Sequence, residues 1–323
     1  ISIVLDQRNL LVSSLEKLDF VEKIYKSDAN FLLVKVDNAN LRYSNIHEGT
    51  LHGSNLCTEI YLHTKHSEYK DGEKTKVGET AVCNLSSINL SNHIEDGKVK
   101  KSLLSQTIKK IIRALDNVID INYYPTNKTD NSNKKHRPIG IGIQGLADAF
   151  AIMDIPFHSD LAKQINKNIF ETMYHAALEA SMEAAKEEGP YSSFKGSPAS
   201  EGILQFDMWN VTPSNRYDWD ILKLNISEHG LRNSLLLAPM PTASTSQILG
   251  NNECFEPFTS NIYVRRTIAG EFVCINKFLL KELIDLGLWT DEIKNSIIRQ
   301  NGSVQNVKGI PKGLQEKYKI VWE

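Results

Sequence analysis

The sequence predicts an α/β barrel or a layered α/β domain. Segments with a helical apolar period alternate with short apolar runs typical of strands. The 323 residues suffice for one large domain or two ordinary ones. Hydrophobic residues make up 41% and charged residues 24%, as in soluble globular proteins, and a net charge of −2 indicates neither a nucleic-acid nor a membrane surface.

The N-terminal part of the chain predicts a helix over residues 3–18 and a buried strand over residues 31–36. The stretch 38–53 is polar and weakly patterned. The stretch 63–79 is rich in charged residues and predicts a surface loop.

The middle of the chain predicts two long helices. Residues 101–121 repeat apolar side chains at helical spacing. The second helix covers residues 159–188, with Ser159 as its N-cap and Gly189 at its end. Its expected core stripe consists of Leu161, Ile165, Ile169 and Met173. Between the two helices, residues 126–137 predict a polar, basic loop, and residues 139–145 predict an apolar, glycine-rich segment that leads into a helix ending at Ile152.

The C-terminal part predicts one buried strand and two helices. Residues 235–237 form a continuous apolar run of the kind found in parallel sheets covered on both faces. Helices are expected near 276–287 and 290–300.

The four cysteines are too few for a disulfide framework in a chain of this length, which favours a reducing cytosolic environment. There, a cysteine is most often a small buried apolar residue, and we expect this of Cys254 and Cys274.

The segment SNLCTEI at residues 54–60 predicts unusual chemistry. If it is extended, Asn55, Cys57 and Glu59 lie on one face. A neighbouring carboxylate disfavours a thiolate, so this face suits a neutral thiol that gives and takes a hydrogen atom, with Glu59 as a general base. The alternative is a buried cysteine on an edge strand with two solvated neighbours.

A zinc set of Cys57, His63, His66 and Cys83 is a weaker alternative, because the spacings match no compact zinc motif. The sequence therefore predicts no metal site.

Three further patterns have a structural and a functional interpretation. Residues 241–246 (PTASTS) follow the apolar strand and could cradle an anion, or they could form a strand–helix turn with a Ser or Thr cap.

Gly140, Gly142 and Gly145 match a dinucleotide-binding spacing, but no acidic residue is placed to bind a ribose, so close backbone packing is favoured. The basic residues 134–137 predict a solvated loop.

Several long motifs together resemble the large subunit of ribonucleotide reductase, from about residue 46 to residue 323. The resemblance rests on SNLCTEI at 54–60, AVCNLSS at 81–87, HRPIGIGIQGLADAF at 136–150, GILQFDMWNVTP at 202–213, PMPTASTSQILGNNECFEP at 239–257 and TSNIYVRRTIAGE at 259–271. It implies part of a ten-stranded α/β barrel with a finger loop through its centre, preceded here by a short helix–strand segment.

The resemblance also implies a role for each matched residue. Cys57 becomes a thiyl radical that abstracts the ribose 3′ hydrogen, while Asn55 and Glu59 contact the ribose hydroxyls, with Glu59 as the base. Cys83 is one member of a redox pair whose partner lies upstream of this chain. Substrate contacts are implied for Ser54, Leu56 and Thr58, and contacts to the substrate diphosphate for Thr242, Ala243, Ser244 and Thr245.

Residues 1–43 resemble a different family. The run at 18–35 (LDFVEKIYKSDANFLLVK) is similar to the small domain of histidinol-phosphate aminotransferase, a pyridoxal-phosphate enzyme. The expected division is therefore an aminotransferase-like segment at 1–43 and an incomplete reductase barrel at 46–323.

The reductase resemblance implies the conversion of ribonucleoside diphosphates to deoxyribonucleoside diphosphates, for DNA replication. It implies a metal-containing small subunit that supplies the radical, thioredoxin or glutaredoxin as reductant, a homodimer and a cytoplasmic location. No cofactor is expected on this chain, and the allosteric ATP and dATP sites belong to a part it lacks. We expect the 323 residues alone to be nearly inactive. The alternatives are a non-catalytic fragment that binds nucleotide phosphates and an aminotransferase remnant.

Overall fold

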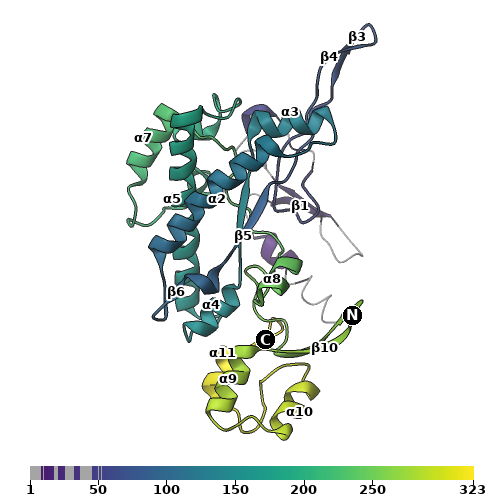
Figure 1. Cartoon of the computed structure of the whole chain (residues 1–323), viewed down its shortest axis with the longest axis vertical. Coiled ribbons are helices and arrows are strands. Elements are labelled where there is room, and N and C mark those ends of the chain that lie inside the picture. Colours follow the sequence, from purple (N-terminus) through teal and green to yellow (C-terminus); the bar gives the residue numbers. More distant parts are fainter. Residues whose placement is uncertain are drawn as a thin grey trace.

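The computed structural model describes residues 9, 11–17, 21–25, 33–36, 46–49, 51 and 53–323. It has a mixed α/β architecture, which confirms the predicted fold class. Figure 1 shows helices gathered around a short sheet in one half of the molecule, a hairpin that projects at one end, and a cluster of C-terminal helices at the other. In the described part of the chain, no helix is both long and apolar enough to cross a membrane.

A short parallel sheet lies at the centre. Strand β5 (Leu85–Asn89) pairs in parallel with β8 (Gly140–Gln144). Residues 235–238 run along the other side of β8, with a parallel bridge between Ile141 and Leu237. The Ile139 amide donates to the carbonyl of Leu235 at 3.1 Å, and the Ala238 amide donates to that of Ile141 at 3.1 Å. The strand predicted at 235–237 is therefore present as a short parallel partner of β8.

The glycines of β8 allow this close packing, as the sequence predicted. A Cβ on Gly140 would lie 2.7 Å from the Ala238 Cβ and 2.7 Å from the Leu85 side chain. A Cβ on Gly142 would lie 2.9 Å from the Ala238 carbonyl oxygen. Gly145, with φ +72°, then turns the chain into helix α4 (Leu146–Ile152), a conformation that glycine adopts at little cost.

Helices α2 (Lys101–Ile121) and α5 (Asp160–Glu188) cover the sheet and lie side by side (Figure 1). Their buried apolar residues belong to one core with those of β8. Ser159 caps α5, since its hydroxyl accepts from the Ala162 amide at 3.1 Å, and Gly189 ends that helix. In the expected stripe, Ile169 and Met173 are buried and Ile165 packs against the core, but Leu161 is 57% exposed. Leu161 lies in the first turn of α5, where its side chain faces solvent.

The loop predicted at 126–137 is instead helix α3 (Asn127–His136). Thr126 and Thr129 form a reciprocal capping box at its start, and Arg137 ends it with φ +44°. The buried residues of α3 have the helical spacing i, i+3, i+4, i+7, but all of them are polar: Thr129, Ser132, Asn133 and His136. The apolar period that would have indicated this helix is therefore absent.

At the N-terminal end, β1 (Val21–Tyr25) and β2 (Leu33–Val36) form an antiparallel pair. The strand predicted at 31–36 is confirmed over Leu33–Val36, and residues 31–32 lie outside the described residues. Of the helix predicted at 3–18, residues 9 and 11–15 are described as helical. The sequence did not indicate β1.

The charged stretch 63–79 forms an exposed antiparallel hairpin of β3 (Glu68–Lys70) and β4 (Glu73–Lys76), which projects from the molecule in Figure 1. A surface insertion was predicted, but the two ends of the stretch, His63 and Glu79, are buried. Helix η3 (Leu90–His93) and the short strands β6 (Ile94–Glu95) and β7 (Lys98–Val99) lead from β5 to α2.

The C-terminal part begins with the hairpin of β9 (Ile262–Thr267) and β10 (Gly270–Ile275). Helices α9 (Lys277–Asp285), α10 (Asp291–Arg299) and α11 (Lys312–Lys317) follow around a second apolar core, which confirms the two predicted helices. The remaining helical segments are η2 (Ile46–Glu48), η4 (Pro198–Glu201), α6 (Gln205–Met208), α7 (Trp219–His229) and α8 (Ala243–Leu249).

Candidate functional site

The segment 54–60 is a closed turn, so the extended conformation considered from the sequence is not present. The Asn55 side chain causes the difference, because its Oδ1 accepts from the Ile60 amide at 3.0 Å. The Asn55 amide also donates to the Ile60 carbonyl at 3.3 Å, and Thr58, with φ +65°, donates to the Asn55 carbonyl. A local side-chain hydrogen bond has thus replaced ladder pairing, and Asn55 faces its own loop.

The turn presents Cys57 to solvent. Cys57 is exposed, and the neighbouring Leu56 is 98% exposed. The interpretation of Cys57 as a buried residue on an edge strand is therefore wrong. Ser54 and Thr58 are exposed as well, whereas Glu59 is half-buried. Among the described residues, one carboxylate oxygen of Glu59 is buried and has no hydrogen-bond partner.

The alternation that would have placed Asn55, Cys57 and Glu59 on one face is not observed, but Cys57 and Glu59 both lie near enough to Cys83 to act on its thiol. Cys83 is exposed as a residue, but partial desolvation of its thiol raises the pKa of that group, and the negative charges of Glu59 and Cys57 raise it further. Charges act on a thiol in this way only when they lie close to it. Cys83 is therefore a protonated thiol near neutral pH.

The other two cysteines differ from each other. Cys254 is buried, as predicted. Cys274 is only partly buried on β10, where its thiol donates to the Phe272 carbonyl, so full burial was wrong for this residue. All four cysteines are free thiols.

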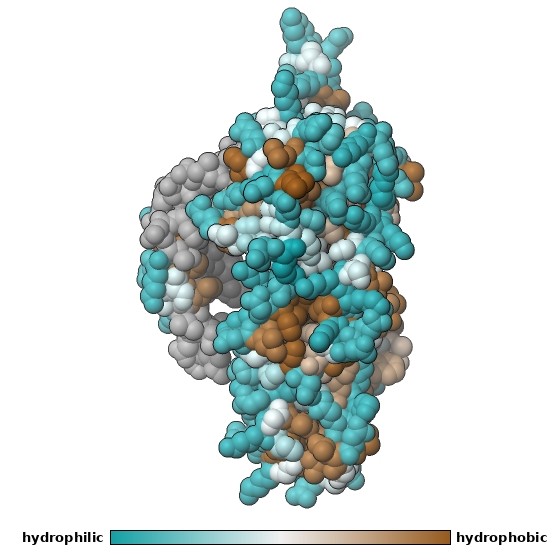
Figure 2. Space-filling view, turned by 90° about the vertical axis from the view of Figure 1, so that its left-hand side faces the viewer, coloured by the Kyte–Doolittle hydropathy of each residue, from teal (hydrophilic) through white to brown (hydrophobic). Residues whose placement is uncertain are grey.

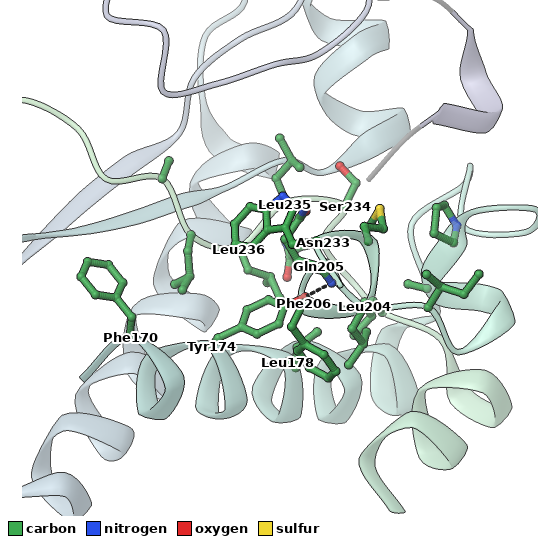
Figure 3. A pocket seen from close by; sticks show the side chains of 18 of the residues that line it. Phe170, Tyr174, Leu178, Leu204, Gln205, Phe206, Asn233, Ser234, Leu235 and Leu236 are labelled. Carbon is green, nitrogen blue, oxygen red and sulfur yellow. Dashed lines mark hydrogen bonds between the residues drawn. The ribbon is translucent and has the colours of Figure 1, made fainter. Parts of the chain in front are cut away.

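A cavity of about 760 Å³ opens beside Glu59. Figure 3 shows Phe170, Tyr174 and Leu178 of α5 along one side of it, and residues 204–206 and 233–236 around the rest. The Tyr174 hydroxyl accepts from the Gln205 amide at 3.2 Å. The sequence did not predict the cavity, although the motif at 202–213 supplies much of its lining. Figure 2 shows apolar side chains gathered midway along one face of the molecule.

The segment 241–246 turns from the central sheet into α8, so the strand–helix turn is present, but the predicted Ser or Thr side-chain cap is not. The Thr242 hydroxyl does not cap the helix. It is buried and accepts from the Cys254 amide at 2.7 Å. The Thr245 hydroxyl donates to Gln144 Oε1 at 3.0 Å. Ala243, Ser244 and Thr245 form an exposed first turn, where backbone N–H groups have no intrahelical acceptor.

The basic residues 134–137 are not a solvated loop. His136 and Arg137 are buried. Lys135 pairs with Glu48 at 2.8 Å and with Glu79 at 3.0 Å. The burial arises because α3 packs its polar face against distant segments of the chain.

His63 is buried near Glu48 and Glu79, whereas Cys57, Cys83 and His66 are exposed, so the zinc set considered from the sequence is not assembled. Burial alone would raise the pKa of Glu79, but hydrogen bonds from His136 and Lys135 lower it to about 2. The pKa of Glu48 is likewise lowered to about 2, against the effect of burial, by Lys135 and Lys65. Burial, reinforced by Lys65, lowers the pKa of His63.

Comparisons with known proteins agree with the fold and the motifs. Residues 16–323 match the family model of the ribonucleotide reductase barrel domain. The ribonucleoside-diphosphate reductase large chain of Neurospora crassa is 53% identical over 295 residues, which cover 91% of this chain and 30% of that protein. That of Schizosaccharomyces pombe is 52% identical over 293 residues, covering 91% and 35%. The large subunit of Danio rerio is 51% identical over 304 residues, covering 94% and 37%.

The chain thus spans about a third of the length of the curated relatives it matches. Both the family model and the relatives cover most of this chain. We conclude that the chain belongs to the ribonucleotide reductase large-subunit family and carries part of its α/β barrel.

Proposed function

We propose that the protein to which this barrel part belongs reduces ribonucleoside diphosphates to deoxyribonucleoside diphosphates by thiyl-radical chemistry. The observation that carries the proposal is the loop at 54–60. It presents the Cys57 thiol to solvent, close to Glu59 and Cys83 and beside a large cavity. The similarity to ribonucleoside-diphosphate reductase large chains supports the same activity.

In the proposed reaction, Cys57 exchanges a hydrogen atom with the 3′ carbon of the ribose. Glu59 accepts a proton from a ribose hydroxyl, for which its buried and unpartnered carboxylate oxygen is suited. Loss of the 2′ hydroxyl as water consumes two electrons, and a dithiol supplies them as it becomes a disulfide. Cys83 is one of these thiols, and its partner belongs to the upstream part of the protein.

The substrate contacts are proposed from the same loop and from α8. The residues that flank Cys57 in sequence are Ser54, Asn55, Leu56 and Thr58. Three of them, Ser54, Leu56 and Thr58, are exposed to solvent and are assigned to substrate contact. The exposed turn of Ala243, Ser244 and Thr245, together with Thr242, would hold the diphosphate through backbone N–H groups.

The partners are proposals too. A small subunit supplies the radical, and thioredoxin or glutaredoxin restores the dithiol. The complete protein is a cytoplasmic homodimer with allosteric nucleotide sites outside this barrel part.

We also propose that residues 1–43 have a separate, aminotransferase-like origin. In support, β1 and β2 pair with each other, and the described strands of the barrel do not extend this sheet. The family match nevertheless begins at residue 16, inside this segment. A chain that lacks residues 1–43 should therefore keep the thermal unfolding midpoint of the barrel part, whereas a large decrease would show that the segment is integral to it.

The activity is tested by placing residues 46–323 in the large chain of the Schizosaccharomyces pombe relative, in exchange for the matched part. Deoxyribonucleotide formation is then measured with that organism's small subunit and a thioredoxin system. We expect turnover that is lost in Cys57→Ser and Glu59→Gln but retained in the control Cys274→Ser. Nucleotide binding without turnover in the unsubstituted chimera would favour the non-catalytic binding fragment.

A further inference from the structure

We propose that Glu48, His63, Glu79 and His136 form a binding site for one divalent transition-metal ion of the zinc type, which fixes the base of the Cys57 loop. The proposal does not depend on the reductase activity. One ligand atom from each of these four side chains lies within 4.8 Å of the other three. His63, Glu79 and His136 are buried, and Glu48 is partly buried.

The spacing of the ligand atoms fits a shared ion. His63 Nε2 lies 3.8 Å from Glu48 Oε2 and 3.8 Å from Glu79 Oε2. These distances exceed a hydrogen bond, whereas ligands held about 2.0–2.2 Å from a tetrahedral zinc ion stand roughly 3.3–3.6 Å apart. A shift of a few tenths of an ångström would therefore bring His63 to coordination spacing with both carboxylates, whereas His136 Nε2 and Glu79 Oε2, 2.6 Å apart, must separate by roughly 1 Å to admit the ion.

The donor set also suits zinc. Two imidazole nitrogens and two carboxylate oxygens are ligands that Zn²⁺ accepts, and four protein ligands are typical of a closed, structural site. His136 has the outer support that a ligating histidine usually has, since its Nδ1 lies 2.7 Å from the Ser193 hydroxyl. With a proton on Nδ1 that is donated to Ser193, the Nε2 lone pair faces Glu79 and the ion.

Two lysines compete with the metal. Lys65 Nζ lies 2.7 Å from Glu48 Oε2, and Lys135 Nζ bridges Glu48 and Glu79. These ammonium groups neutralise both carboxylates when no ion is bound. Their side chains are 39% and 28% exposed, so either one can swing into water as an ion enters. The proton between His136 Nε2 and Glu79 Oε2, which lie 2.6 Å apart, also gives way to the ion.

The four ligands come from segments that flank the reactive cysteines. Glu48 precedes the loop at 54–60 and His63 follows it. Glu79 precedes Cys83, and His136 is the last residue of α3. A metal ion at this site would therefore link the segments on both sides of the loop at 54–60, and the segment that precedes Cys83, to the C-terminal end of α3.

The test is a zinc titration of the untagged, chelator-treated 323-residue chain, followed by calorimetry. Cobalt(II) serves as a second probe, because its visible absorption reports tetrahedral coordination. We expect one equivalent to bind. His63→Gln should weaken zinc binding about 100-fold or more, the upper end of what loss of a supporting group costs a metal site. The control His66→Gln, an exposed histidine three residues away, should bind zinc as the unmodified chain does.

A second variant keeps the test decisive if His63→Gln fails to fold. Lys135→Met removes a competing charge and leaves all four ligands in place. It should tighten zinc binding by roughly tenfold, the effect that one charge at this distance has on a neighbouring ionisation. The proposal is overturned if zinc shows no saturable site, if His63→Gln binds as tightly as His66→Gln, or if Lys135→Met weakens binding.

Discussion

Two buried polar clusters meet at the end of α3, where His136 and Arg137 are adjacent in sequence but face different partners. Arg137 donates from Nε to Asp116 at 2.8 Å, and from its two terminal nitrogens to Asp120 at 2.8 and 2.7 Å. Asp116 also accepts from Arg232 at 3.2 Å and from Asn233 at 2.9 Å. In this Arg137 cluster, each carboxylate meets guanidinium or amide donors at hydrogen-bond distance.

The His136 cluster, made of Glu48, His63, Glu79 and His136, is different in kind. Its ligand atoms lie within 4.8 Å of one another, and its counter-ions are lysines that reach solvent. A guanidinium stays charged and has fixed geometry, whereas imidazole and ammonium groups can exchange protons and positions. The Arg137 cluster therefore fastens α2 permanently to Arg232 and Asn233, just before the strand at 235–238, while the His136 cluster can exchange the ions that hold the loop at 54–60.

The largest effect is expected from breaking the Arg137 cluster. Arg137→Met leaves Asp116 buried with fewer donors, and removal of one partner from a buried ion pair costs about 3–5 kcal/mol. The free energy of unfolding, measured by urea denaturation, should fall by that amount. The matched control is Arg113→Met, because Arg113 pairs with Glu187 and Glu188 at the surface, where an ion pair contributes about 0–1 kcal/mol. Equal losses in the two variants would contradict the permanent role of the Arg137 cluster.

A smaller effect is expected in the His136 cluster. Glu79→Gln keeps a polar side chain of similar shape but removes the charge that faces Lys135 and His136. Leaving those buried groups partly unsatisfied should cost about 1–3 kcal/mol in the free energy of unfolding. The exposed Glu68→Gln in the β3–β4 hairpin is the control and should change it little. If Glu79→Gln were neutral, the cluster would not be needed to hold the loop.

Helices with an apolar buried face could be predicted from the sequence, whereas a helix with a polar buried face could not. Helix α2 was predicted with its observed bounds because its core positions are apolar and locally periodic. Helix α3 was missed because its buried face is polar, and its partners lie far away in sequence: Glu79 is 57 residues from His136, and Glu48 is 87 residues from Lys135. No local pattern reports such contacts.

The candidate site shows the same limit. The roles assigned to Cys57, Glu59 and Cys83 stay predictions, whereas the extended geometry was wrong, because one hydrogen bond to the Asn55 side chain closes the segment into a turn. The cavity beside Glu59 could not be predicted either, since α5 and the segments 202–213 and 233–239 only meet in three dimensions.

The His136 cluster should lose stability in acid. The pKa values of Glu48 and Glu79 are lowered to about 2, from 4.5, so the stability they contribute is present above pH 4.5 and is lost as pH falls toward 2. The pKa of His63 is lowered from 6.5, so the unfolded chain takes up that proton first, and stability also falls as pH drops below 6.5. For Glu48, Glu79 and His63 alike, the free energy of unfolding therefore decreases as the pH falls.

Thermal unfolding midpoints at pH 7.5, 6 and 5 check this prediction. His63→Gln should flatten the loss between pH 6.5 and 5 relative to the unmodified chain. His175→Gln is a matched control for a second partly buried histidine whose pKa is lowered by burial, on α5 and outside the cluster. Both variants should reduce the decrease of the unfolding midpoint between pH 6.5 and 5. Only His63→Gln should also abolish the effect of added zinc on that midpoint.

The smallest effect is expected at the tip of the β3–β4 hairpin, which projects from the rest of the molecule (Figure 1). Residues 68–76 are exposed, so replacing them with a short glycine–asparagine turn should change the free energy of unfolding by about 0.5 kcal/mol or less. The base of the hairpin is different. Lys65 and Glu79 exchange backbone hydrogen bonds at 3.0 and 2.9 Å, and a Cβ on Gly78 would lie 2.2 Å from the Lys65 carbonyl oxygen. Gly78→Ala should therefore cost about 1–3 kcal/mol by overpacking. Shortening the tip could instead lower the free energy of unfolding as much as Gly78→Ala does. The exposed hairpin would then help to hold the His136 cluster, and with it the loop at 54–60.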